Sequence, residues 1–378
     1  MKRCFGWVAG WVTVAVGGAA LACPFCGTVG PTLAMRRDAA PTTAVGSAAG
    51  PALETPAGGQ VQPFAVGSLI RGRPLPDEAL VTARVPAPVA GTALLFGGGE
   101  ARADGTPPFE AVAADELLLA HVARAPDTGR PSAERLAFFA ARLEHPLEAI
   151  AADAFAEFGQ APFAAVRAAA PALAARPLAE WLGDPGIDQR RRGFYGLALG
   201  IVAHAGLPAD APASSAPLRA ALEANADDFR AGTDGLMGGL LVADGPAGLE
   251  WLMGRVAPQR PVEQKQLLGA LRFAWEELAA TIPREQIVAA TATLATSPVV
   301  AADAVIDLAR ERGWDHVDRV AGLWHTLGGD DPHVRRAVAG YLTACPRPEA
   351  RAHLETLRRS DGRRLDEAIR AAGLLRAE

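Results

Sequence analysis

The sequence predicts an α+β multidomain protein in which a small N-terminal β barrel or sandwich is followed by an all-α solenoid. The chain has 378 residues, which exceeds the size at which a single hydrophobic core usually stops growing. Short β-compatible runs separated by Gly and Pro occupy the first third, and helical periodicity occupies the rest. Half of the residues are hydrophobic and 21% are charged, which is typical of a folded chain.

The first 22 residues are typical of a signal peptide. Lys2 and Arg3 precede an uncharged stretch of 18 residues, which ends in the small-x-small sequence Ala20-Leu21-Ala22. We therefore expect residues 1–22 to be removed and the protein to be exported to the periplasm, the cell envelope or the medium. Cleavage would make Cys23 the first residue, and a lipid attached to Cys23 is the alternative that would place the protein on a membrane.

Residues 23–125 are predicted to form the β-rich domain. Five strands of this length suit a small barrel or sandwich of roughly 80–100 residues. The runs are Thr42 to Ser47, Val61 to Ile70, Leu80 to Val85, Thr92 to Phe96 and Phe109 to Ala113.

Two parts of this region resemble a known barrel family. A strand ending in Ile70-Arg71-Gly72, and Ala90-Gly91 leading into Leu94-Leu95-Phe96-Gly97, resemble the netrin-like or tissue-inhibitor type of OB barrel. The resemblance covers under a third of the chain. It implies a barrel, and in that family an N-terminal cysteine amine can block a protease zinc. That activity goes with a Cys-x-Cys start and several disulfides, whereas this region has only Cys23 and Cys26, at a different spacing.

Residues 126–378 are predicted to form consecutive helix pairs. The clearest helix begins at Asp331, a good N-cap, with Pro332 in the first turn. Similar openings occur at Pro146, Pro185 and Pro261, and again at Pro298, with one more helix pair near Leu236 to Val256. A period of roughly 35–40 residues with two helices in each repeat is the signature of an α-solenoid.

The string Asp331-Pro332-His333-Val334-Arg335-Arg336-Ala337 resembles the first helix of a HEAT repeat. In degenerate form the resemblance covers about 245 residues, and it implies that the aspartate and arginine form ladders between repeats. Taken whole, the Cys-Pro-Phe-Cys start, the small β region and the helical array resemble a group of uncharacterised exported bacterial proteins. That resemblance implies a β domain followed by a helical array, and an exported location.

Charge and motifs exclude several classes of function. The chain has 37 basic and 42 acidic residues, a net charge of −5 that becomes −7 without Lys2 and Arg3, so a generally basic nucleic-acid surface is excluded. The single lysine of the mature chain, Lys265, is flanked by glutamines, which excludes a P-loop. No histidine is followed by Glu, and there is no Gly-x-Ser-x-Gly elbow. We identify no catalytic residue, metal ligand set or cofactor.

Cys23 and Cys26 are the sharpest chemical feature of the sequence. Two cysteines at this spacing can close a disulfide, exchange disulfides or bind metal. In an oxidising compartment we expect a local disulfide that holds the N-terminus in a turn against the first strand. Lipid attachment at Cys23 and redox or metal chemistry are the alternatives. Cys345, on the apolar face of its helix, is expected to be a buried small hydrophobe.

Two groups combine arginine with large aromatic residues, the types enriched at interface hot spots. The first contains Arg190, Arg191 and Tyr195, and the second contains Arg272 and Trp275. They are candidate partner-binding residues. The alternative is that the aromatic rings fill the core between repeats while the arginines pair with neighbouring acids.

These features favour a non-enzymatic exported interaction or scaffold protein that presents a helical surface to an unidentified protein or peptide. The competing hypotheses are a thiol redox or metal-binding protein that uses Cys23 and Cys26, and, more remotely, a netrin-like protease inhibitor.

Replacing both Cys23 and Cys26 with serine should lower the free energy of unfolding by about 1–3 kcal/mol, because a disulfide this local closes only a short loop. Urea unfolding followed by circular dichroism measures the change, and the helical signal should remain. Free thiols at both positions, found by alkylation and mass spectrometry of the exported protein, would contradict the disulfide. A diacylglyceryl mass on Cys23 would replace it with lipid attachment.

Overall fold

The structure is a computed structural model of the chain. It describes residues 25–26, 29–56, 58–76, 79–98, 108–206, 214–224, 231–256 and 260–374. The expected signal peptide and Cys23 lie outside the described residues, so the cleavage site and the pairing of Cys23 stay predictions.

The N-terminal part is a small barrel of five main strands, as the turn-separated β runs predicted, to which the two-residue strand β2 is added. The strands are β1 (Thr42–Ala48), β2 (Leu53–Glu54), β3 (Gln60–Gly72), β4 (Leu80–Val85), β5 (Thr92–Gly97) and β6 (Phe109–Ala113). Their order in the sheet is β1-β5-β6-β4-β3-β2, and β1 also pairs with β3, which closes the barrel. The pair β4–β6 is parallel and the other pairs are antiparallel. Phe64, Leu95 and Phe109 fill the interior.

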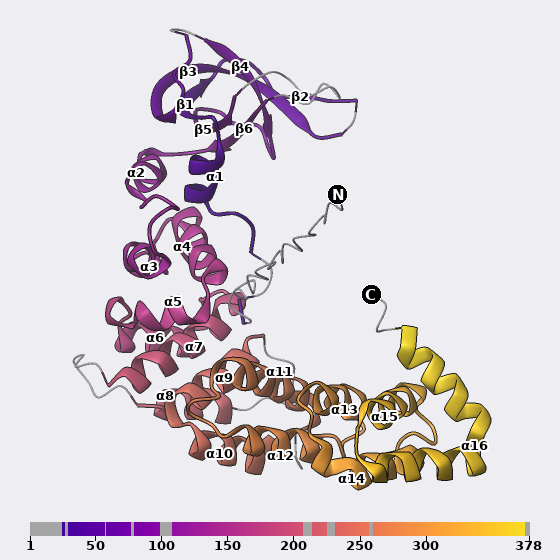
Figure 1. Cartoon of the computed structure of the whole chain (residues 1–378). Helices are drawn as coiled ribbons and strands as arrows, with labels where there is room; N and C mark the ends of the chain where they lie inside the picture. The colour runs from indigo at the N-terminus through magenta and orange to yellow at the C-terminus, as the bar shows by residue number, and fades with distance from the viewer. Residues whose placement is uncertain are drawn as a thin grey trace, which may run out of the picture.

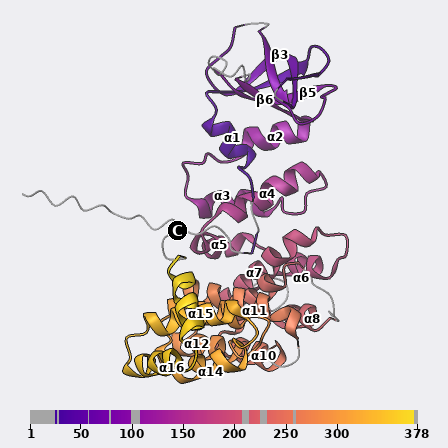
Figure 2. The same cartoon turned by 90° about the vertical axis from the view of Figure 1, so that its right-hand side faces the viewer.

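Two helices that the sequence analysis did not predict lie between the barrel and the rest of the chain (Figures 1 and 2). They are α1 (Leu33–Ala39) and α2 (Glu116–Arg124), capped by the side chains of Thr32 and Asp115. Leu118 and Val122 of α2 pack with Leu94 and Phe96 of β5 and with Ile150 of the helical part. A second core therefore joins the barrel to the helices.

Arg37 of α1 holds the chain where the barrel region ends. It is buried, and its guanidinium donates to the carbonyl oxygens of Val122 at 2.8 Å and Ala125 at 2.6 Å. It also pairs with Asp38 and Asp127, at 2.7 and 3.1 Å. The expected domain boundary at 125/126 falls within this packed segment.

The rest of the chain is helical to residue 374. The elements are α3 (Ser132–Ala140), α4 (Glu148–Gln160), α5 (Phe163–Ala168), η1 (Ala170–Ala172), α6 (Ala175–Gly183), α7 (Gln189–Ala205), α8 (Ala216–Glu223), α9 (Thr233–Asp244), α10 (Pro246–Val256), α11 (Pro261–Glu277), α12 (Arg284–Leu294), α13 (Ala301–Arg310), η2 (Trp314–His316), α14 (Val317–Thr326), α15 (Pro332–Ala344) and α16 (Pro348–Leu374).

From α9 onward the helices form two rows. In Figure 1 the helices α9, α11, α13 and α15 follow one another in one row, and α10, α12, α14 and the first part of α16 run beneath them. The array lies at a steep angle to the column formed by the barrel and helices α1 to α6. One hydrophobic core runs through the helical part from Leu136 to Ala368.

The predicted helix starts agree with the structure to within four residues. Asp331 caps α15, its Oδ1 accepting from the backbone N–H of His333 at 2.7 Å. The pair α9–α10 lies where one was expected, between Leu236 and Val256. Helix α3 begins at Ser132, and no side chain caps it.

Helices α7 and α9 touch through glycines, so that their backbones are in contact. A Cβ on Gly200 would overlap the carbonyl of Gly239, a Cβ on Gly239 would overlap the carbonyl of Gly196, and a Cβ on Gly235 would overlap Gly193. Only glycine permits this approach, and it fixes the position of the array against the column above it.

Replacing Gly239 with alanine should lower the free energy of unfolding by about 1–3 kcal/mol, because the added methyl group must separate two helices packed backbone to backbone. Chemical denaturation measures the change. The control is Gly322→Ala in α14, where a Cβ would meet nothing within 4 Å and where the change should stabilise the protein by about 0.5–1 kcal/mol. Equal effects of the two changes would contradict the close contact of α7 and α9.

Candidate functional site

The Cys-Pro-Phe-Cys segment packs on the helices, not on the first strand. Phe25 and Cys26 are both buried. The ring of Phe25 meets that of Phe273 edge to face, with centroids 5.0 Å apart, and lies against Gly238 of α9. The Cβ of Cys26 lies beside Gly159 of α4. The expectation that this segment is held against Thr42 to Ser47 was therefore wrong: a phenylalanine gains more from a slot formed by glycines and Phe273 than from the rim of a small barrel.

Both described cysteines are buried. Cys345 is buried and has a free thiol, as the position on an apolar helix face predicted. No disulfide joins two described residues, and the expected bond to Cys23 involves a residue outside them. Cys26 has only 4% of its surface exposed, so a thiol of another molecule has little access to its sulfur.

Of the first arginine–aromatic group, Arg191 and Tyr195 are internal. Arg191 is 4% exposed and binds Glu144 at 3.2 Å and also Glu148. The Tyr195 hydroxyl donates to the carboxylate of Glu144. Burial, and then this hydrogen bond, raises the pKa of Tyr195 far above its usual value. These side chains tie α7 to the start of α4 and to the segment before it.

Arg190 is the exposed member of that group. It pairs with Asp188 at 2.6 Å at the start of α7, and its side chain is largely exposed. Together with Cys26 and Glu148 it lines a cavity of about 380 Å³ between the N-terminal segment, α4 and α7. Asp188 and Glu148 also line this cavity and pair with Arg190 and Arg191, so the cavity presents no uncompensated positive charge.

The second group, Arg272 and Trp275, also makes internal contacts. Arg272 donates from Nε to Oδ2 of the buried Asp307 at 2.6 Å, which links α11 to α13. Trp275 is partly buried against the core, and the guanidinium of Arg284 stacks over it at 4.6 Å. The two groups contact different residues, so these contacts do not join them into one site.

Sequence reasoning missed the buried acids beside Arg272. Glu311 is the residue directly after α13, one turn beyond Asp307, and its Oε2 has no hydrogen-bond partner among the described residues. Burial, and then the charge of Asp307, raises the pKa of Glu311 to about 7, although Arg272 opposes this. Burial also raises the pKa of Asp307, against the effect of its bond to Arg272.

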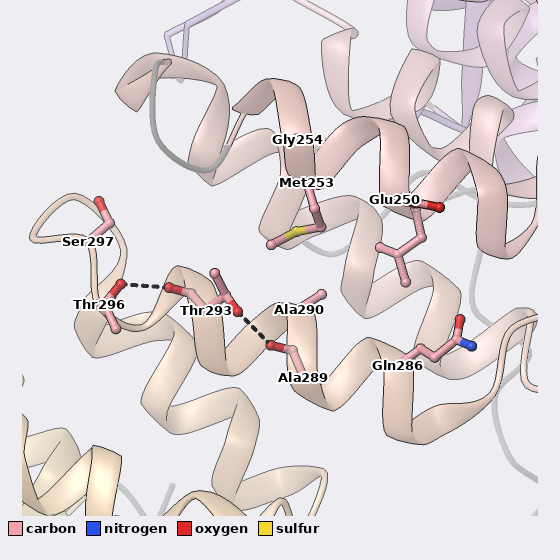
Figure 3. Close-up of a pocket in the computed structure, with 10 residues that line it drawn as sticks. Glu250, Met253, Gly254, Gln286, Ala289, Ala290, Thr293, Thr296 and Ser297 are labelled. Carbon is pink, nitrogen blue, oxygen red and sulfur yellow. Dashed lines mark hydrogen bonds between the residues drawn. The ribbon is translucent and has the colours of Figure 1, made fainter.

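A large surface groove lies between α10 and α12 (Figure 3). It encloses about 790 Å³. Its lining residues are Leu249, Glu250, Met253, Gly254, Gln286, Ala289, Ala290, Thr293, Thr296 and Ser297. Figure 3 shows Met253 reaching from α10 toward α12.

The groove has an apolar lining and a single charge. The hydroxyl of Thr293 donates to the carbonyl of Ala289 at 3.0 Å, and that of Thr296 donates to the carbonyl of Thr293 at 2.8 Å. With these donors used internally, the small side chains of α12 present mainly carbon atoms. Glu250 is the one charged side chain of the lining. Small residues gave no signal for this groove in a chain so rich in alanine.

Comparison with known proteins gives no relative: no family model, no curated protein and no solved structure matches the chain. Within the described ranges, no group of three or more His, Cys, Asp or Glu residues could hold a metal ion. None of the helices in those ranges combines the length and apolar character needed to cross a bilayer.

Replacing Glu311 with glutamine should raise the stability of the protein at pH 8 and change it little at pH 5. A carboxyl whose pKa is raised on folding is protonated without penalty below about pH 4.5, and its burial becomes costly as the pH rises toward 7. We expect a gain of about 2 kcal/mol at pH 8, measured by denaturation at both pH values. The exposed Glu285→Gln serves as control. The same gain at both pH values would contradict an ionisation effect.

Proposed function

We propose that the protein is an exported, non-enzymatic interaction protein that binds a protein or peptide partner in the groove between α10 and α12. The observation that carries the proposal is the groove itself, which is large, open at the surface, apolar and made by two neighbouring helices. An amphipathic helix that lies in a hydrophobic groove is one of the recurring modes of peptide recognition.

The chemistry of the groove indicates the kind of partner. Met253 and Leu249 can pack against aliphatic side chains, and the small residues Ala289 and Ala290 let a second backbone come close. Glu250 would pair with a lysine or arginine of the partner. The acidic charge of the chain, −7 without the expected signal peptide, would draw a basic partner toward the protein. We therefore propose an amphipathic segment with at least one basic residue.

We further propose that the helical array is of the HEAT type and the barrel of the OB type. The ion pair between Arg272 of α11 and Asp307 of α13 joins helices of successive pairs, as a ladder between repeats would. Without the two-residue strand β2, the strands run around the barrel in the order β1, β3, β4, β6 and β5, and β4 and β6 are parallel. These are the first, second, third, fifth and fourth of the five main strands along the chain. That order supports the OB interpretation.

The competing functions receive less support from the described residues. Thiol exchange needs a reachable sulfur, and Cys26 is buried against α4. Protease inhibition of the netrin type needs an N-terminus presented at the barrel surface, and Phe25 is instead inserted among α9 and α11. Arg191, Tyr195, Arg272 and Trp275 make contacts within the fold, and the exposed Arg190 is paired with Asp188. We therefore propose the groove as the partner-binding site in their place.

Peptide display against the full chain tests the proposal. Selected peptides should be amphipathic and basic, and filling the groove with Ala289→Trp should weaken their binding at least ten-fold, measured by fluorescence anisotropy. Charge reversal by Glu250→Lys should weaken the binding of the basic peptides and reduce its salt dependence.

Two exposed positions on α16 supply matched controls, Ala352→Trp and Glu355→Lys. Both should leave the affinity unchanged. Peptides that bind Ala289→Trp as tightly as the unchanged protein would place binding elsewhere and contradict the proposed site.

A further inference from the structure

A second cavity, separate from the α10–α12 groove, lies near the C-terminal end of the array. It encloses about 410 Å³, which is at the small end of the range for ligand pockets. Three helices form it: α13, α15 and the last turns of α16. The lining residues are Ile306, Ala309, Arg310, Arg336, Ala337, Gly340, Tyr341, Ala344 and Ala372.

The third wall of this cavity exists because α16 bends. Asp361 has non-helical backbone angles (φ −148°, ψ 44°), and its carboxylate accepts a hydrogen bond from Nε1 of Trp324 at 3.3 Å. Beyond the bend, the second half of α16 turns back from the end of the array (Figure 1). This brings Ala372 beside Gly340 of α15, where a Cβ on the glycine would lie 3.4 Å from that of Ala372.

The floor of the cavity is apolar. Ile306 and Ala309 lie on one face of α13, and Ala337, Gly340 and Ala344 lie on one face of α15. Tyr341 also contributes only carbon atoms, since its hydroxyl donates to the carbonyl of Gly313 at 2.7 Å. A hydrocarbon chain could therefore lie along this floor without leaving a polar group unpaired.

Two guanidinium groups border the floor, and none of the lining residues is acidic. Arg336 makes no ion pair with any described residue. Arg310 lies 3.5 Å from Asp307, but that carboxylate has a closer partner in Arg272 at 2.6 Å. The positive charge at the cavity is therefore mostly uncompensated, in contrast to the paired arginines Arg190 and Arg191.

We propose that this cavity binds a single-chain anionic amphiphile, whose acyl chain lies on the α13–α15 floor and whose carboxylate is held by Arg336, with Arg310 nearby. Guanidinium groups form strong charge-assisted hydrogen bonds with carboxylates, and small residues leave space for an unbranched chain. The site is independent of the peptide groove, because the two share no lining residue.

Titration calorimetry of the full chain with dodecanoate, below its micelle concentration, tests the site. We expect saturable binding with one site per chain. Arg336→Gln should weaken it about ten-fold or more, and Arg336→Lys less, because the charge remains. Ala344→Phe, which fills the floor, should abolish binding. Circular dichroism and the melting temperature check that each variant is folded.

Two comparisons separate this site from unspecific binding of detergent-like molecules. Dodecan-1-ol has the same chain without the charge and should bind at least ten-fold more weakly. The exposed Arg351→Gln on α16 should bind dodecanoate like the unchanged protein. Equal affinity for the alcohol, an unchanged affinity of Arg336→Gln, or an absence of saturable binding would each overturn the proposal. None of these results would bear on peptide binding in the groove, where Ala289→Trp is the test.

Discussion

The direct contact between the backbones of α7 and α9 is the constraint on which the rest of the structure depends. It requires glycine on both helices, at Gly196 and Gly200 on one side and at Gly235 and Gly239 on the other. Because the two helices meet without side chains between them, their relative position is tightly determined. The same glycine-rich surface continues to Gly238, where it provides the slot that Phe25 fills.

The segment that begins at Phe25 makes a second connection between the barrel and the helical part, in addition to the core formed by α2, β5 and Ile150. Farther along this segment, the Thr32 hydroxyl donates to Glu157 at 2.6 Å and the backbone of Leu33 donates to Asp153 at 2.6 Å. Asp153 also binds His121 of α2, and Glu157 binds Arg135 of α3. Buried charges of this kind add little net stability but strongly penalise other arrangements. The segment from Phe25 to Leu33 thus helps to fix the position of the barrel on the helices.

Local signals were sufficient to predict most elements but not how they meet. The strands from Thr42 to Ala113 could be predicted because turn residues separate them, and the helix at Asp331 because its cap and proline act within one turn. Helices α1 and α2 were missed because they are short and their stability comes from packing against the barrel and α4. The docking of Phe25 depends on Gly238 and Phe273, more than 200 positions away, and no local pattern reports such a contact.

The difference between local signals and distant contacts also explains why residue types alone pointed to the arginine–aromatic groups as candidate binding sites. Arginine beside aromatic residues is typical of interfaces, but what decides the role of a guanidinium is whether the fold supplies an acid. Glu144 meets Arg191 and Asp307 meets Arg272, so those arginines are structural. Arg336 occurs in a string interpreted as a structural ladder, yet no described acid reaches it, and it borders a cavity. The absence of a partner, which only the folded chain can reveal, is therefore a better guide to binding residues here than composition.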